Sequence, residues 1–404
     1  MFFASLALIL IAGGILGFLA KKIRIPALIV YLLLGIILGY FGLIDDNITA
    51  ISAELRKIAL IIILIKAGLS LDLKELKKVG RPAILLSFIP AVTEMVAIGL
   101  IGPSLLNLTY LESFLLGSVL GAVSPAVVVP RMVKMIENSQ GTNKGIPQMI
   151  IAGSSLDDIV MIVFYTSFLT IESGGSINYM SFLNVPISIV SGVGIGILIG
   201  LFLALLFKKV HMRDSLKLTV ILGICFGLVF LETFLSTWFE FSSLLACITI
   251  GIVVLTTRPI QARRIAEKCD RLWTVAEIFL FILVGATIKL DSVWTIIGPA
   301  LAVIAIGLAL RMLSTFPCLI KTNLNFKERL YVAISYTPKA TVQAAIGGGL
   351  LDLGNSLGNP AIQAAGSIVL ITSVISIIFT APLGALAMDV SVTKLTTRSI
   401  NTQQ

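Results

Sequence analysis

Two adjacent carboxylates, Asp157 and Asp158, lie near the middle of an apolar stretch that runs from Ile146 to Glu172. A helix of about 27 residues is long enough to cross a bilayer, because the hydrocarbon core is roughly 30 Å thick and each helical residue rises about 1.5 Å. A carboxylate at that depth costs on the order of 2.5–3.5 kcal/mol to insert. We therefore expect the pair to serve a function that offsets this cost.

A carboxylate pair inside a membrane protein has two kinds of ligand. Its oxygens can bind a small hard cation such as Na⁺ or Li⁺, and they can also take up a proton. A protonated acid is a poor cation ligand, so the two ligands compete, and competition combined with alternating access is sufficient for cation/proton exchange. Successive helical residues diverge by about 100°, so one aspartate could ligate the ion while the other couples to a cation or a helix end.

Few other ionisable side chains are predicted at membrane depth: Glu94, Glu277, Arg311, Lys339 and Lys66. Arg311 stays charged at any depth and needs a partner. Glu94 is the candidate, because each of the two residues is central in the span that precedes a broken one, and one of the aspartates is the alternative.

For the other ionisable residues at membrane depth, the sequence predicts roles that are less specific. Lys339 directly follows Pro338, where it could neutralise the C-terminal end of a half-helix or carry the transported proton. Glu277 could line an inner funnel or extend to the surface. Lys66 has a long apolar stem and is expected to anchor its helix at the membrane interface.

The elements that position these residues are predicted to be transmembrane helices. The chain is 57% hydrophobic and 13% charged, and apolar runs of 18 or more residues recur along it, so we expect an all-α polytopic membrane protein. The predicted thirteen spans are roughly 2–20, 27–43, 51–71, 82–105, 110–136, 146–172, 182–208, 215–234, 238–257, 272–290, 293–320, 328–353 and 361–388.

The basic residues predict the orientation of these spans. Most of the 30 lysines and arginines fall in alternate connections, and the opposite face holds only Arg56, Lys57 and Lys289. The asymmetry places the N-terminus outside and the C-terminus, with a short tail at 389–404, in the cytoplasm. The net charge of +9 is therefore a topology signal, and no nucleic-acid partner is expected. We expect the protein in a cell membrane, the inner membrane of a bacterium.

Two spans contain proline in mid-run, in Gly121–Pro130 and in Ser335–Gly348. Proline removes a backbone donor and clashes with the preceding turn, and broken helices at membrane depth line cavities. The pairs Ser124-Pro125 and Thr337-Pro338 predict that spans 4–6 and 11–13 form an inverted repeat with two crossing broken helices. The thirteenth span carries no charge, so the aspartate pair has no symmetry mate.

No cofactor and no structural metal site are predicted. The single histidine, His211, lies in the basic connection Lys208–Lys217, and the cysteines have no metal-ligand spacing. We expect the cysteines to be reduced, three in apolar runs and Cys269 in a basic loop. The metal ion expected at Asp157 and Asp158 is the transported cation itself.

Other functions account for parts of this pattern. A sodium-coupled symporter of a small organic anion is the main alternative, but it would need more polar or aromatic contacts at the breaks. An intramembrane aspartyl protease requires aspartates that face each other, so no enzyme activity is expected. A channel does not require the repeated broken helices. The aspartates could also cap a helix, but the run has no Pro or Gly after Gly153.

Three segments resemble a known family: Ser154–Asp158, Gly121–Pro130 and Thr337–Ala345. They are similar to the sodium/proton antiporters of the cation:proton antiporter superfamily, in its NHA branch. The resemblance covers nearly the whole chain. It implies exchange of Na⁺ or Li⁺ for H⁺ at the aspartates, and a role in pH homeostasis.

The resemblance also implies an assembly and a supporting network. It implies a homodimer in which dimerisation helices (1–81 and 182–290) hold a core that moves like an elevator (82–172 and 293–388). The polar network implied around the aspartates comprises Glu94, Arg311, Lys339, Ser155, Ser124, Thr337 and Gln343. Some electrogenic relatives have a lysine at the position of Arg311, so the proton stoichiometry stays open.

Overall fold

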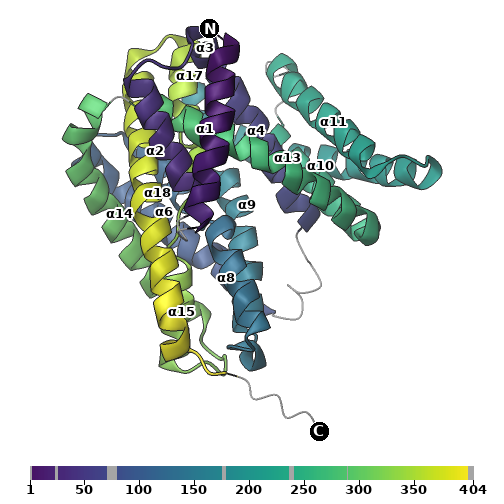
Figure 1. The fold of residues 1–404 in the computed structure, drawn as a ribbon, viewed down its shortest axis with the longest axis vertical. Helices are drawn as coiled ribbons and strands as arrows, with labels where there is room; N and C mark the ends of the chain where they lie inside the picture. Colours follow the sequence, from purple (N-terminus) through teal and green to yellow (C-terminus); the bar gives the residue numbers. More distant parts are fainter. Residues whose placement is uncertain are drawn as a thin grey trace. The chain divides into compact units, whose positions relative to one another are not determined.

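This computed structural model describes residues 2–22, 26–70, 80–174, 179–235, 241–288 and 290–398 (Figure 1). Within those ranges the regular structure is helical, with one isolated bridge between Gln140 and Arg398. The helices are α1 (Phe2–Lys22), α2 (Ala27–Tyr40), α3 (Asp46–Ala50), α4 (Ser52–Ser70), α6 (Arg81–Leu106), α7 (Tyr110–Leu120), α8 (Pro125–Glu137), η1 (Thr142–Lys144), α9 (Ile146–Ser173), α10 (Tyr179–Lys209), α11 (Asp214–Leu235), α12 (Ser243–Thr257), α13 (Pro259–Ala286), α14 (Leu290–Cys318), α15 (Phe326–Ser335), α16 (Thr341–Ile346), α17 (Gly349–Leu357) and α18 (Pro360–Leu395).

The apolar helices can be compared with the predicted membrane spans. In the described ranges, eight segments are long and apolar enough to cross a bilayer: α1, α6, α7 with α8, α9, α10, α11, α14 and α18. Two further apolar helices, α2 and α12, are shorter. The all-α membrane class is confirmed, and the total of thirteen spans stays a prediction.

The helix α13 differs from its prediction. We expected a basic loop at 258–271, but a helix begins at Pro259 and carries all of its basic residues except Arg258. Proline suits the first position of a helix, where its missing N–H is not needed. Ala262, Ile265, Cys269 and Trp273 are buried along one face of the segment, so it is an amphipathic helix whose charges conceal it from a search for apolar runs.

Both predicted helix breaks are present. Residues 121–124 separate α7 from α8, and residues 336–340 separate α15 from α16. The first half of each broken span also begins in the same way, because α7 and α15 each start with a capping box, Thr109 with Glu112 and Asn325 with Glu328. In this motif, side chains satisfy backbone donors at the helix start. The shared start supports the predicted repeat.

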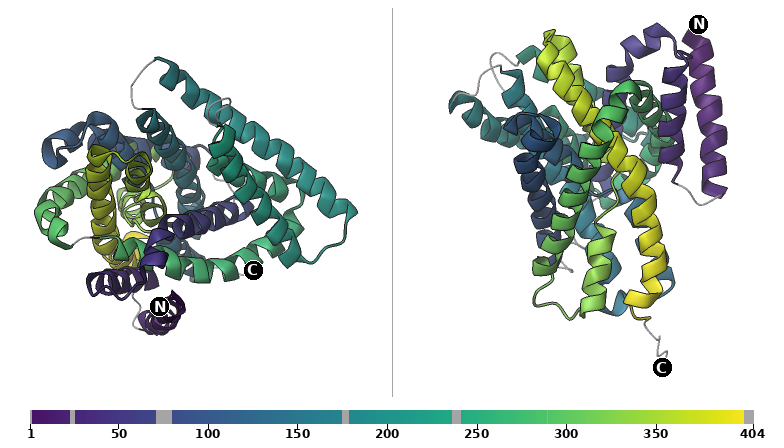
Figure 2. Two further views of the ribbon diagram at one scale, coloured as in Figure 1. Left: turned by 90° about the horizontal axis from the view of Figure 1, so that it is seen from above. Right: turned by 90° about the vertical axis from the view of Figure 1, so that its left-hand side faces the viewer.

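The chain forms two compact units. The first comprises Met1–Ala50, Lys74–Tyr165 and Phe281–Gln404, and the second comprises Ile51–Leu73 and Thr166–Leu280. In the first unit, α14 packs along α6 and against α18, and α6 also packs on α7 (Figure 2). Every residue of the predicted site lies in the first unit.

In the second unit, α12 packs against α10, α4 and α11. Glycines allow the closest of these approaches. A Cβ built on Gly251 of α12 would lie 2.9 Å from the carbonyl carbon and Cα of Gly68 and from the amide nitrogen of Leu69, all in α4. Backbone atoms cannot yield as a flexible side chain can, so this crossing requires glycine.

We expect Gly251→Ala to lower the free energy of unfolding by about 1–3 kcal/mol, the usual cost of overpacking a filled interface. The matched control is Gly223→Ala in α11, where a Cβ meets no atom within 4 Å. The control is expected to be neutral or stabilising, because alanine is the better helix former. Unfolding midpoints in detergent measure both, and equal midpoints would contradict the proposed close crossing.

Candidate functional site

The backbone of the first break is held by groups from distant segments. The Gly121 carbonyl accepts a hydrogen bond from Arg311 Nη1, and the Val123 amide donates to Asp157 Oδ2 at 3.2 Å. The Ser124 amide donates to the Pro338 carbonyl at 2.9 Å. The last contact joins the two breaks directly. Backbone groups freed by the interruption therefore find protein partners, as burial requires.

Gln343, in α16, joins the breaks a second time. Its Nε2 donates to the carbonyls of Val119 at 3.0 Å and Ala122 at 2.9 Å, while its Oε1 accepts from the Ala340 amide at 2.7 Å. One fully buried amide thus satisfies backbone groups on both broken spans. Sequence analysis placed Gln343 in the network, and the structure shows what it contacts there.

Arg311 of α14 is the centre of a buried ion network. Its Nη1 lies 2.7 Å from Glu94 Oε2 and its Nη2 lies 2.6 Å from Asp157 Oδ2. The sequence left the choice between these two partners open, and Arg311 binds both. The planar guanidinium makes this possible, since its donors point in several fixed directions.

Lys339 completes the network. Its Nζ lies 2.6 Å from Glu94 Oε2, so Glu94 serves two cations with one oxygen. The Lys339 amide donates to Thr380 Oγ1 at 2.9 Å. All four charged side chains are at most 2% exposed. Removal from water is costly for each ion, and opposite charges at these distances offset that cost.

Asp158 differs from Asp157 in its contacts. Both lie within the continuous helix α9, which excludes the helix-cap interpretation. Among the described residues, Asp158 makes no ion pair, and its Oδ1 is buried without a hydrogen-bond partner. Asp157 Oδ1 is likewise buried and unpaired within that part of the chain. The site therefore has two cations and three carboxylates, and with all of them ionised it would carry one negative charge more than its cations balance.

Tyr336 belongs to this site and was missed by sequence analysis. Its ring centroid lies 5.6 Å from the Arg311 guanidinium carbon, a cation–π contact. A Cβ on Gly153 would clash with the Tyr336 hydroxyl oxygen, so glycine lets α9 approach the tyrosine one turn before Asp157. The sequence signal was present, since Tyr336 immediately precedes Thr337-Pro338 at the second break.

The other residues singled out by sequence analysis take no part in the ion pairs around Arg311 among the described residues. The Ser124 hydroxyl is buried without a partner among the described residues, whereas Thr337 Oγ1 donates to the Ile334 carbonyl at 2.8 Å, within its own turn. The side chain of Ser155 lies outside what the structure describes. In the second unit, Lys66 pairs with Asp270 at 2.5 Å. Glu277 is half-buried in α13.

The fold has solved counterparts. The structure of the sodium proton antiporter MjNhaP1 from Methanocaldococcus jannaschii at pH 8 superposes with a TM-score of 0.82. That likeness covers 96% of this chain and 97% of the archaeal chain at 25% sequence identity.

Sequence comparison identifies the family. The model of the family "Sodium/hydrogen exchanger, transmembrane" matches residues 6–385. Sodium/hydrogen exchanger 9B2 of Homo sapiens is 33% identical over 388 residues, which cover 93% of this chain and 71% of the human protein. Sodium/hydrogen exchanger 9B1 of Mus musculus is 35% identical over 399 residues, which cover 94% and 68%. This chain therefore belongs to the sodium/hydrogen exchanger family of integral membrane proteins.

Proposed function

We propose that the protein is a secondary antiporter that exchanges Na⁺ or Li⁺ for H⁺ at Asp157 and Asp158. The observation that carries the proposal is the charge balance around Arg311. Arg311 and Lys339 offset Glu94 and Asp157 through ion pairs, which leaves Asp158 without a cation partner among the described residues. A desolvated carboxylate is stabilised when a cation or a proton neutralises it.

The exchange follows from competition for one acid. When Na⁺ binds, the carboxylate oxygens of Asp158, with the unpaired Oδ1 of Asp157, supply the hard ligands that this ion prefers. When a proton binds Asp158, the neutral acid no longer attracts the cation. Each ligand thus displaces the other, and exposure of the site to one side of the membrane at a time converts the displacement into antiport.

The network positions Asp157 for this role. Arg311 binds Oδ2 of Asp157 at 2.6 Å, and the Val123 amide donates to the same oxygen at 3.2 Å. These contacts hold the carboxylate so that Oδ1 is the oxygen left for a cation. Arg311 cannot lose its proton, so its part is to position Asp157 and to balance charge.

We also propose the assembly that the sequence resemblance implies. The protein forms a homodimer through helices in 1–81 and 182–290, while residues 82–172 and 293–388 form an ion-transporting core that moves as an elevator. The N-terminus lies outside the cell membrane and the C-terminus lies in the cytoplasm. These proposals are supported by the family, by the charge asymmetry of the connections and by the meeting of two helix breaks beside the aspartates.

We expect Asp158→Asn to abolish exchange, because the amide neither releases a proton nor attracts a cation. The assay is dequenching of a pH-sensitive dye in proteoliposomes after addition of Na⁺ or Li⁺ alone, with no organic solute. Asp291→Asn, an exposed acid of α14, is the matched control and should transport normally. Full activity of the Asp158 variant would overturn the site, and a signal that required an organic anion would favour a symporter.

Charge counting predicts electroneutral exchange. Either Na⁺ or H⁺ neutralises the carboxylate of Asp158. The loaded site therefore has the same net charge whichever ion it carries across the membrane. In solid-supported membrane recordings, a Na⁺ jump should give no sustained current, and an imposed membrane potential should not change the dequenching rate. A rate that rises with an inside-positive potential would indicate that a second proton leaves for each Na⁺ that enters, with Lys339 as its carrier.

Glu94 and Lys339 should also depend on each other in their effect on the free energy of unfolding. Glu94→Gln leaves Lys339 without its anion and should lower the free energy of unfolding by about 3–5 kcal/mol, the cost of breaking a buried pair. Adding Lys339→Met should recover part of that loss, since the unpaired charge is then gone. Glu54→Gln, an exposed acid of α4, is the control and should stay within about 0.5 kcal/mol. Additive losses in the double variant would show that the two residues do not interact.

A further inference from the structure

The ion pair between Arg311 and Asp157 leaves one group of each partner unused. Arg311 Nη2 lies 2.6 Å from Asp157 Oδ2, whereas Arg311 Nε and Asp157 Oδ1 are both buried without a hydrogen-bond partner among the described residues. A guanidinium and a carboxylate frequently pair through two parallel hydrogen bonds, an arrangement that would satisfy both groups. Glu94 and the Gly121 carbonyl hold Nη1, but they leave the guanidinium free to tilt about that end. Another group must fix the tilt.

The aromatic ring of Tyr336 lies beside this guanidinium. The ring centroid is 5.6 Å from the guanidinium carbon of Arg311, and both side chains are fully buried. The face of an aromatic ring attracts a cation, most strongly where water is excluded. This attraction acts on the guanidinium as a whole and not on one N–H group, so it can determine how the planar group is tilted.

Tyr336 is itself held by the helices that carry the partners of Arg311. Its amide donates to the Ala333 carbonyl at 3.2 Å, at the end of α15. Its hydroxyl lies against Gly153 of α9, where a Cβ would clash with it, and the Leu86 Cβ of α6 is 3.2 Å from the same point. The hydroxyl has no hydrogen-bond partner within the described part of the chain. Packing, in an apolar cluster that includes Leu86 and Val332, therefore fixes the ring.

We propose that Tyr336 is a positioning residue whose ring restricts Arg311 to one oxygen of Asp157 and so keeps the other oxygen free for the transported cation. The inference rests on the antiport proposed above. Without the ring, Arg311 can turn its Nε toward Oδ1, and an aspartate paired through both oxygens no longer offers a ligand to Na⁺. The ring does not act on the ion directly, so its loss should weaken Na⁺ binding without slowing the loaded site.

The test measures Na⁺ affinity in detergent, as the Na⁺ concentration that gives half of the rise in unfolding temperature, with choline keeping the ionic strength constant. Tyr336→Leu should weaken the affinity about tenfold, the size of a cation–π contact away from water. Tyr336→Phe keeps the ring and should retain the wild-type affinity. In proteoliposomes, Tyr336→Leu should raise the KM for Na⁺ by the same factor and leave the maximal rate unchanged.

Tyr331→Leu is the matched control. Tyr331 lies in the same helix and the same apolar cluster and is 1% exposed, but its hydroxyl donates to the sulfur of Met135 at 3.0 Å. Both leucine variants should lower the unfolding temperature without Na⁺, and only Tyr336→Leu should change the affinity. Equal affinities in the two would show that Tyr336 only fills space. An equal loss in Tyr336→Phe would assign the effect to the hydroxyl, and either result overturns the proposal.

A second pair of variants applies if Tyr336→Leu does not fold. Gly153→Ala pushes the tyrosine hydroxyl away from α9 and should weaken Na⁺ binding, and adding Tyr336→Phe should restore it because the clashing oxygen is gone. Failure to restore the affinity would contradict the proposal. A wild-type chain that Na⁺ does not stabilise, or stabilisation that survives Asp158→Asn, would instead overturn the antiport site, and this inference with it, before any tyrosine variant is compared.

Discussion

The buried guanidinium of Arg311 is the group on which the rest of the first unit depends. It contacts Glu94 of α6, Asp157 of α9 and the Gly121 carbonyl in the first break. An arginine deep in an apolar protein cannot shed its charge, so it is stable there only with anionic and carbonyl partners beside it. The same side chain therefore stabilises the packing of α6, α9 and α14 and determines which oxygen of Asp157 is occupied.

The two helix breaks are stable because each supplies what the other lacks. Ser124 of one donates to the Pro338 carbonyl of the other, and Gln343 of α16 reaches back to the carbonyls of Val119 and Ala122. An interruption in one span alone would leave backbone groups without partners in a place that water does not reach. Their reciprocity places non-helical backbone beside the aspartates without leaving the freed amides and carbonyls unsatisfied.

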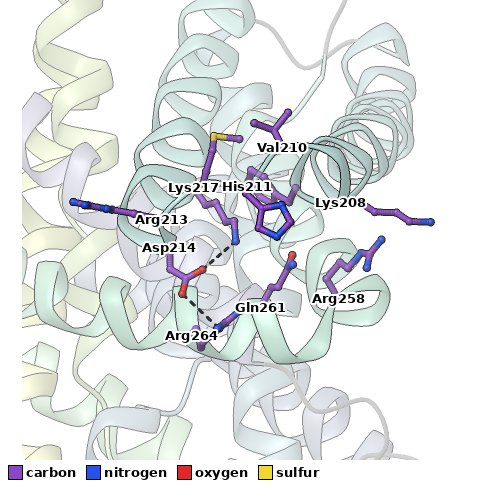
Figure 3. A pocket seen from close by; sticks show the side chains of 11 residues that line it. Lys208, Val210, His211, Arg213, Asp214, Lys217, Arg258, Gln261 and Arg264 are labelled. Atoms are coloured by element: carbon purple, nitrogen blue, oxygen red, sulfur yellow. Dashed lines mark hydrogen bonds and ion pairs between the residues drawn. The ribbon is translucent and has the colours of Figure 1, made fainter.

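The balance between positive and negative side chains differs between the two units. In the first, four buried ions are paired at 2.6–2.7 Å and Asp158 is the charge left over. In the second, the connection between α10 and α11 and the start of α13 bring five lysines and arginines around one acid, Asp214 (Figure 3). A surplus anion at membrane depth suits a transported cation.

Sequence alone determined the helical class, the two breaks and the residues that carry charge at depth, because apolar length and proline act locally. The tertiary structure decided how those charges combine. Arg311 and Glu94 lie 217 residues apart, and only the packing of α6 against α14 brings them together and adds Asp157 to the pair. The tertiary structure also shows that Tyr336 is a neighbour of Arg311. It further shows that the predicted basic loop is the start of α13, an amphipathic helix whose apolar face is stable only when other parts of the protein cover it.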